Sequence, residues 1–307
     1  MKRVLITGIA GFTGRYVAQA CKARDYEVHG LSHLPVPAGV AGADAVHICD
    51  LLDAGRLSAL VAQAEATHVI HLAAISFVGN GDAEAMYRTN VVGTRNLLEA
   101  VARCERRPVA VVVASSANVY GNATAGSIDE SAPLAPANDY AVSKVAVEFL
   151  ARLYANRLPI VVTRPFNYTG VGQSTQFLLP KIVAHAQRRA DEIELGNLDV
   201  ERDFSDVRTV AEVYARLLDT PAAIGGTFNI CSGRAHSLET VLGTVRRLSG
   251  QALPARVNPA FVRSNEVLRL LGDPTKLEAV IGTLPRVELE STLQWMLDAP
   301  LEQPSRH

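Results

Sequence analysis

A tyrosine and a lysine four residues apart are the side chains in this sequence whose types and spacing most directly predict chemistry. Tyr140 and Lys144 lie in an apolar run that reads as a helix through about Asn156, so both leave the same helix face one turn apart. A free phenol has a pKa of about 10 and keeps its proton near neutral pH. Because a neighbouring ammonium favours the phenolate, the pair predicts a proton donor to a substrate oxygen. A capping tyrosine beside a solvated lysine would have the same spacing.

Two serines could assist such a donor. Ser115 and Ser116 follow a predicted strand over Val109–Ala114 and precede Tyr140 in the chain. Hydroxyls at the carboxyl end of a central strand could polarise a carbonyl group held against the phenol.

A glycine-rich stretch near the start of the chain predicts a cofactor site. An apolar run over residues 2–7 leads into three glycines, and an amphipathic stretch follows from about Arg15 to Ala23. Glycines let the backbone approach a pyrophosphate closely, while the amino terminus of a helix offers free N–H groups. We therefore expect a dinucleotide at Gly8, Gly11, Phe12, Thr13 and Gly14.

The end of the next predicted strand, Glu27–Leu31, bears on the type of dinucleotide. Ser32 and His33 stand where an NAD-selective site usually carries a carboxylate for the ribose hydroxyls. A carboxylate would repel a ribose phosphate, so its absence favours NADP(H), with Ser32 and His33 as phosphate partners. NAD(H) stays possible, because some NAD enzymes also lack the acid and His33 could be a plain loop residue.

Two further strand ends supply candidate cofactor contacts. Asp50 follows the predicted strand Ala45–Ile48 and could accept a hydrogen bond from an adenine amino group, or instead cap the next helix. The strand that begins at His68 ends in small residues that let the backbone pass close to a cofactor. We expect cofactor contacts from Asp50, Leu51, Leu72, Ala73 and Ala74. In the following helical pattern, Ala83–Cys104, a buried Asn90 needs partners and is predicted to tie the helix to a neighbouring strand.

Composition excludes several other classes of function. The chain has 307 residues, 48% of them hydrophobic, and a formal net charge of -1, so it can bury a large core and shows no general attraction to nucleic acid or anionic membranes. No segment reaches membrane-spanning length, and Thr7-Gly8 ends the first apolar run too soon for a signal peptide. We expect a cytoplasmic protein with no metal site, and buried thiols without paired spacing at Cys21, Cys49, Cys104 and Cys231.

With the glycine turn, the strand-end serines and Tyr-x-x-x-Lys in one βαβ series, the chain resembles the extended short-chain dehydrogenase/reductase family over nearly its whole length. The resemblance implies an α/β fold with a doubly wound, parallel, Rossmann-like sheet and a smaller C-terminal lobe. It implies that Tyr140 is the acid/base and that Lys144 holds the cofactor ribose and lowers the pKa of the phenol. Ser116 is the implied hydroxyl partner, because it stands four residues before Tyr120 in Ser-Ala-Asn-Val-Tyr-Gly.

Three downstream stretches are similar to those of enzymes that act on GDP-mannose and its 6-deoxy products. By this resemblance Asn167 faces the sugar diphosphate, and the stretch 194–204 wraps the nucleotide with Asn197 and Arg202. The stretch 263–276 resembles an Arg-Pro-x-Glu-Val motif, and its Arg263 and Glu266 would hold phosphate and ribose hydroxyls. A guanidinium suits bidentate phosphate binding and a carboxylate accepts from a diol. Ser76 could touch the sugar or be an ordinary loop residue.

Position 118 separates two related reactions. A 4,6-dehydratase needs a carboxylate base besides the tyrosine, and the family places a Glu two residues before the tyrosine of Tyr-Gly. Here that residue is Asn118. The sequence therefore favours hydride delivery from NADPH to C4 of GDP-4-keto-6-deoxy-D-mannose, giving GDP-D-rhamnose or GDP-6-deoxy-D-talose. The alternatives are a GDP-mannose 4,6-dehydratase, another nucleotide-sugar 4-epimerase, or a non-catalytic NADP-binding sensor.

The predicted organisation has two parts. Residues 1–165, with about 209–231, should form the cofactor domain, and 166–208 with 232–307 the substrate lobe. The resemblance also implies a homodimer, formed by the helices near Ala83–Cys104 and Tyr140–Asn156. From the net charge we expect no nucleic-acid or membrane partner.

Overall fold

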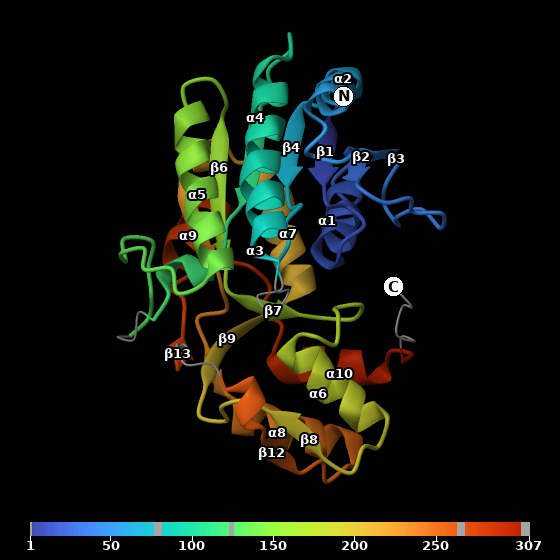
Figure 1. Cartoon of the computed structure of the whole chain (residues 1–307), viewed down its shortest axis with the longest axis vertical. Helices are drawn as coiled ribbons and strands as arrows, with labels where there is room; N and C mark the ends of the chain where they lie inside the picture. The colour runs from blue at the N-terminus through green and yellow to red at the C-terminus, as the bar shows by residue number, and fades with distance from the viewer. Residues whose placement is uncertain (1, 77–81, 123–125, 263–267, 302–307) are drawn as a thin grey trace.

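A seven-stranded sheet, in which every neighbouring pair of strands is parallel, is the largest element of the computed structural model (Figure 1), which describes residues 2–76, 82–122, 126–262 and 268–301. The strand order is β10-β6-β5-β4-β1-β2-β3. The strands are β1 (Arg3–Thr7), β2 (Glu27–Ser32), β3 (Ala45–Ile48), β4 (His68–His71), β5 (Ala110–Ala114), β6 (Ile160–Pro165) and β10 (Thr227–Ile230). Because β1 pairs with both β2 and β4, the order reverses there, and the predicted doubly wound fold is confirmed.

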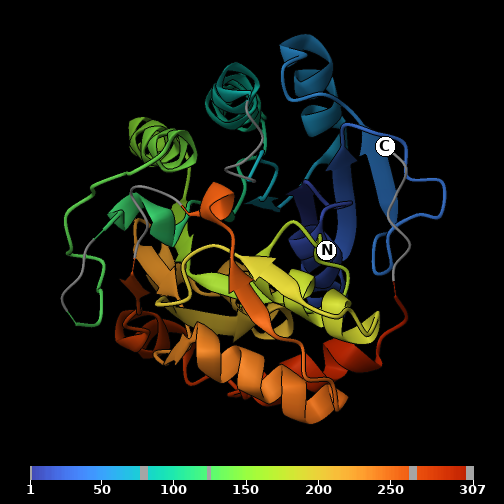
Figure 2. The same cartoon turned by 60° about the horizontal axis from the view of Figure 1, so that its bottom comes forward.

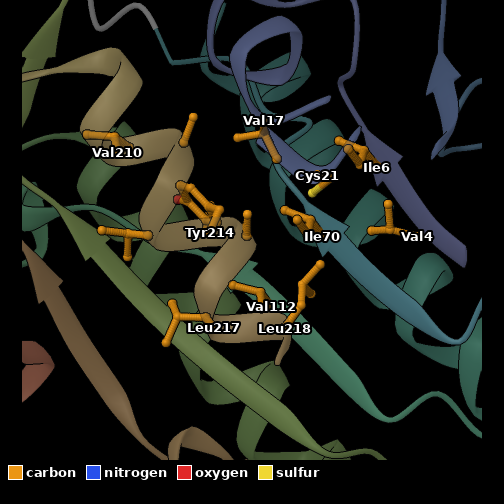
Figure 3. Close-up of a cluster of buried hydrophobic side chains, with 14 of the residues drawn as sticks. Val4, Ile6, Val17, Cys21, Ile70, Val112, Val210, Tyr214, Leu217 and Leu218 are labelled. Atoms are coloured by element: carbon orange, nitrogen blue, oxygen red, sulfur yellow. The ribbon is translucent and has the colours of Figure 1, made fainter. Parts of the chain in front are cut away.

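Helices cover both faces of this sheet, which explains why its central strands are continuous apolar runs. One face carries α1 (Phe12–Lys22) and α7 (Val207–Leu218), and the other carries α2 (Ala54–Ala64), α4 (Thr94–Ala102) and α5 (Asp139–Tyr154). Figure 3 shows the core on the α1 and α7 face, with labelled side chains Val4, Ile6, Val17, Cys21, Ile70, Val112, Val210, Tyr214, Leu217 and Leu218.

A smaller lobe lies against one end of the sheet, as Figures 1 and 2 show. Its core is built by α6 (Leu178–Gln187), α8 (Leu238–Ser249) and α10 (Leu289–Asp298). Its strands are β7 (Asn167–Thr169), β8 (Ile193–Leu195), β9 (Glu201–Asp206), β11 (Ala235–Ser237), β12 (Ala255–Val257) and β13 (Arg269–Leu270). One helix from the segment assigned to the lobe, α9 (Thr275–Ile281), instead contacts α7 and β10, and its Leu277 belongs to the core of the large sheet.

The long helix predicted over 83–104 is interrupted. It consists of α3 (Ala83–Tyr87), a π-helical segment η1 (Arg88–Gly93) and α4. Asn90 of η1 is buried; its amide nitrogen donates to the Ile75 carbonyl oxygen and to Ser143 Oγ, each at 3.0 Å. The helix is thus tied to the segment that follows β4 and to α5, where the prediction had only a neighbouring strand. π-helical segments often occur at functional sites.

Two smaller predictions were wrong in part. The first helix begins at Phe12, three residues before the predicted start, because Gly11 already occupies the N-cap position. All four cysteines are free, and Cys21 and Cys49 are buried as predicted, but Cys104 and Cys231 are half-buried.

Within the described ranges, no helix is long and apolar enough to cross a membrane. The same residues contain no group of three or more His, Cys, Asp or Glu side chains that could hold a metal ion.

The turn between β1 and α1 packs too closely for most side chains. Gly8 has a φ of +70°, and a Cβ atom there would lie 2.8 Å from the backbone nitrogen of Ala73. A Cβ atom on Gly14 would lie 2.3 Å from the Gly8 carbonyl oxygen. The first turn of α1 therefore packs directly against the backbone of Gly8 and Ile9.

Gly14→Ala should lower the free energy of unfolding by about 1–3 kcal/mol, because the atoms that its methyl group would meet are backbone. Gly243→Ala is the matched control, since a Cβ atom at this helical position meets nothing within 4 Å. It should raise the free energy of unfolding by up to about 1 kcal/mol. Denaturant titrations measure the free energy of unfolding of both variants and of the wild type. Equal changes in the two variants would contradict the tight packing at Gly14.

Candidate active site at the carboxyl ends of the strands

Tyr140 lies in the first turn of α5, where the Asn138 side chain caps the helix by accepting from the backbone nitrogen of Ala141. Its side chain is buried. Burial raises the pKa of Tyr140 above the ordinary value of a phenol, Tyr168 acts in the same direction, and the interaction with the Ser116 hydroxyl works against both. Desolvation therefore dominates the pKa of Tyr140 in the protein alone, and the lowering of this pKa by Lys144 stays a prediction. Tyr140 is held in its protonated form.

Lys144 lies beside the phenol, one helical turn later. Its Nζ is 5.8 Å from the centroid of the Tyr140 ring and donates to the Ala114 carbonyl oxygen at 2.9 Å, at the end of β5. The side chain is buried, and this burial lowers the pKa of Lys144 to about 8. The structure thus holds an ammonium that loses its proton unusually easily next to a phenol that keeps its own.

The two candidate serines have different partners. Ser115 Oγ donates to Glu148 Oε1 at 2.7 Å, so its hydroxyl is engaged in the interior. Ser116 Oγ accepts from the backbone nitrogen of Asn118 at 3.2 Å and interacts with Tyr140. These contacts support Ser116 as the hydroxyl that could meet a substrate oxygen together with Tyr140.

A buried ion pair beneath these residues was missed by the sequence analysis. Arg164, on β6, donates from Nε and Nη2 to the two carboxylate oxygens of Glu148 at 2.8 and 2.7 Å, and both side chains are at most 4% exposed. Arg164 Nη1 also donates to the Tyr120 hydroxyl, which donates to Asn229 Oδ1. The available signal was an Arg in an apolar strand and a Glu on the buried side of a helix, since such charges are rarely buried unpaired.

The glycine turn fits a dinucleotide pyrophosphate. Gly8, Gly11 and Gly14 leave its surface as bare backbone, and Phe12 and Thr13 open α1, whose first N–H groups have no partner inside the helix. Both residues also contact Tyr168, which follows Asn167 on β7.

The end of β4 lies against this turn, which places Leu72, Ala73 and Ala74 beside it. The backbone nitrogen of Ala73 donates to Thr7 Oγ1 at 3.2 Å. His71 bridges Thr7 and Thr94 with its two ring nitrogens, each 2.7 Å from a hydroxyl. Burial, helped by Lys144, lowers the pKa of His71 to about 3, so this bridge stays uncharged.

The other predicted cofactor contacts are distributed around the ends of β2 and β3. Ser32 is buried and its hydroxyl donates to the Leu34 carbonyl oxygen at 2.7 Å, whereas His33 is exposed. Asp50 is exposed and accepts from the backbone nitrogen of Leu52, while the cap of α2 is Asp53. Leu51 is buried. Contacts from these residues to a cofactor remain predictions.

The predicted substrate residues show one strong feature. The side-chain amide nitrogen of Asn167 is buried and has no hydrogen-bond partner among the described residues. A buried donor without a partner costs free energy, so its retention here favours a ligand group that accepts from it.

The remaining substrate residues are less informative. Asn197 accepts from the backbone nitrogen of Asp199, and Arg202 Nη1 donates to the carbonyl oxygens of Glu201 and Leu268. Ser76 is exposed and follows β4. Arg263 and Glu266 lie outside the described residues. The structure thus brings together Ser116, Tyr140 and Lys144, while Asn197 and Arg202 stand on the lobe.

A doubly wound sheet with a glycine turn after β1, and with Ser, Tyr and Lys gathered at the carboxyl ends of its strands, defines an extended short-chain dehydrogenase/reductase. The chain belongs to the GDP-mannose 4,6 dehydratase family, whose model matches residues 5–296. It is therefore a nucleotide-sugar oxidoreductase of the wider group that includes dehydratases and reductases.

Individual relatives match more than nine-tenths of the chain. A GDP-6-deoxy-D-talose 4-dehydrogenase from Aggregatibacter actinomycetemcomitans is 31% identical over 91% of each chain. A GDP-6-deoxy-D-mannose reductase from Pseudomonas aeruginosa is 31% identical over 96% of each chain.

Two solved structures are also similar. A Burkholderia cenocepacia protein, provisionally described as an epimerase, is 51% identical with a TM-score of 0.91 over 97% of each chain. RMD from Pseudomonas aeruginosa, complexed with NADPH, is 29% identical with a TM-score of 0.84 over 97% of this chain and 98% of that chain.

Lys144→Met should change how stability depends on pH. Because the pKa of Lys144 falls from its ordinary 10.5 to about 8 on folding, the unfolded chain binds more protons between these values. The free energy of unfolding of the wild type should therefore rise relative to that of the variant from pH 8 to 10.5, by up to about 1.4 kcal/mol per pH unit. Denaturant titrations across this range test it, with Lys22→Met as a surface control. A difference in the free energy of unfolding between wild type and Lys144→Met that does not change with pH would contradict the lowered pKa of Lys144.

Proposed function

We propose that the protein reduces the 4-keto group of GDP-4-keto-6-deoxy-D-mannose, giving GDP-D-rhamnose or its C4 epimer GDP-6-deoxy-D-talose. The observation that carries this proposal is a buried, protonated Tyr140 beside Ser116 at a site where position 118 is an asparagine. Ketone reduction needs one proton donor to the oxygen. Dehydration needs a carboxylate base as well, and Asn118 cannot be one.

The bound nicotinamide would supply the hydride. Tyr140 donates its proton to the ketone oxygen, and its raised pKa means that the donor is fully protonated at neutral pH. Ser116 donates a hydrogen bond to the same oxygen and orients the carbonyl. After Tyr140 has donated its proton, Lys144 is a nearby group that can return a proton to the Tyr140 phenolate, because its own pKa is lowered to about 8.

NADP(H) is the cofactor that we favour, and NAD(H) is the alternative. No carboxylate follows β2 to oppose a ribose phosphate, and the structural relative from Pseudomonas aeruginosa holds NADPH. For the substrate, the unpartnered amide nitrogen of Asn167 supports a diphosphate, and the names of the two relatives support guanosine as the nucleoside.

We also propose a homodimer formed through α5 and η1. Val142, Phe149 and Leu153 of α5 expose 40%, 53% and 76% of their surface, and Val92 of η1 exposes 45%. These side chains lie on two segments that contact each other, and a set of exposed large apolar groups on adjacent helices favours burial against a second copy.

Tyr140→Phe removes the proton donor and should lower kcat by about 10²–10⁴-fold while NADPH binding, followed by nicotinamide fluorescence, stays unchanged. The assay supplies GDP-4-keto-6-deoxy-D-mannose, follows loss of NADPH, and identifies the C4 configuration of the product by NMR. No oxidation of NADPH or NADH by the wild type would sink the reductase proposal. Water loss from GDP-mannose, or epimerisation without net hydride uptake, would replace it by a dehydratase or an epimerase. Unchanged turnover in the variant would indicate that Tyr140 is not the donor.

Leu153→Glu should convert the protein from dimer to monomer in light-scattering measurements, because a carboxylate would be buried at the proposed interface. Leu34→Glu is the matched control, since Leu34 is 54% exposed outside α5 and η1 and its replacement should leave the dimer intact. A monomeric wild type, or dissociation by both variants, would rule out this interface.

A further inference from the structure

Tyr168 joins the glycine turn to the substrate lobe. Its hydroxyl is 2.7 Å from Thr13 Oγ1, and its ring stacks on Phe12 with centroids 6.1 Å apart and planes 10° from parallel. Phe12 and Thr13 are the first two residues of α1, which places both contacts at the helix end that fits a pyrophosphate. The two partners are 155 residues apart in the chain.

Tyr168 stands next to Asn167, whose side-chain amide nitrogen is buried without a hydrogen-bond partner in the part of the chain that the structure describes. Tyr168 follows Asn167 on β7, and this strand pairs with β9 of the lobe through Asn167–Phe204, Tyr168–Ser205 and Thr169–Asp206. A movement of the Tyr168 backbone must therefore move Asn167. Tyr168 is also near enough to Tyr140 to affect its pKa.

We propose that Tyr168 is a positioning residue that makes binding of the nucleotide sugar depend on occupancy of the dinucleotide turn. This inference rests on the proposed function, because it assigns Thr13 to the cofactor and Asn167 to the sugar diphosphate. Tyr168 has no role in the proposed chemical step. It orders the site for the sugar diphosphate when the dinucleotide turn is occupied.

The direction of the effect follows from the chemistry of the two hydroxyls. A hydroxyl has one proton to donate and two lone pairs to accept with. When Tyr168 donates to Thr13 Oγ1, the Thr13 proton is free to donate to a phosphate oxygen. Hydrogen bonds in such a chain polarise and strengthen one another, so a phosphate on Thr13 strengthens the bond to Tyr168. The strengthened bond holds β7, and with it Asn167, in one position.

This arrangement needs a neutral phenol. Burial raises the pKa of Tyr168, with the Thr13 hydroxyl acting against it, so the phenol keeps a proton that it can donate to Thr13. A charged pair lies on the neighbouring elements: the Arg208 guanidinium is 3.9 Å from the centroid of the Trp295 ring and pairs with Asp206, the residue opposite Thr169. Asp206 also accepts from Thr292, so its carboxylate is satisfied inside the lobe.

The experiment measures the coupling between the two sites directly. Calorimetry gives the Kd of GDP with and without saturating NADPH for the wild type and for Tyr168→Phe, which removes one oxygen and keeps the ring stacked on Phe12. In the wild type NADPH should tighten GDP binding by about fivefold or more, the lower end of typical couplings between sites. In Tyr168→Phe the ratio of the two Kd values should fall close to one. Thr13→Val should give the same loss, and the double variant no further loss.

Tyr214→Phe is the matched control. The Tyr214 hydroxyl is 3.0 Å from Thr163 Oγ1, so this variant breaks a second buried Tyr–Thr contact whose residues both lie in the large domain. It should keep the wild-type ratio. Hydrogen exchange provides a second readout: NADPH should protect the backbone amides of residues 167–171 in the wild type and in Tyr214→Phe, but not in Tyr168→Phe.

The outcomes separate this inference from the proposed function. If NADPH and GDP both bind and the coupling ratio is the same in Tyr168→Phe and Thr13→Val as in the wild type, the positioning role is wrong. The same holds if Tyr214→Phe loses the coupling equally. If neither NADPH nor NADH binds to the wild type, or GDP does not, the proposed function itself fails.

Discussion

The buried ion pair between Glu148 and Arg164 is the interaction on which the geometry of this site depends. Glu148 is on α5, two turns after Tyr140, and Arg164 is near the end of β6, three residues before Asn167. The carboxylate also accepts from Ser115, the residue before Ser116. One fully satisfied pair thus joins the helix that carries Tyr140, the strand end that carries Ser116, and the strand that leads into the lobe. Removing either partner would leave a buried charge, which typically costs about 3–5 kcal/mol.

Desolvation also decides the protonation states of Tyr140, Lys144 and His71. The same exclusion of water raises the pKa of Tyr140 and lowers those of Lys144 and His71. Neutral forms are favoured in every case, because burial penalises whichever form is charged. The proposed reaction, in which Tyr140 donates a proton to a neutral ketone, is compatible with a site of this kind. Dehydration would need a carboxylate base as well, and position 118 is an asparagine.

Local patterns predicted the sheet and the glycine turn well. The turn is a contiguous stretch between an apolar strand and an amphipathic helix, and Tyr140 and Lys144 share one helix, so short spacings carry both features. Contacts across long separations were not predictable in this way. The Tyr168–Thr13 contact spans 155 residues, and the pairing of Arg164 with Glu148 could be assigned only once β6 and α5 were placed side by side. The rise in the pKa of Tyr140 could not be predicted for a related reason: spacing shows the neighbouring ammonium but not the depth of burial, which raises this pKa.

The link between the two domains is aromatic as well as polar. Phe12 and Tyr16 of α1 meet Tyr168 of β7 and Trp295 of α10, with ring centroids 5.7 to 6.1 Å apart along the cluster, and the Tyr16 hydroxyl donates to the Val171 carbonyl oxygen. The apolar contacts are indifferent to small displacements, whereas a hydrogen bond weakens steeply with misalignment. The packed rings therefore keep the lobe attached to α1, and the hydroxyl pair is the part of the link that can respond to a ligand. In the proposed reaction a hydride donor and a ketone come together between the sheet and the lobe. Such a reaction gains from this division, because one set of contacts attaches the lobe and another adjusts its position.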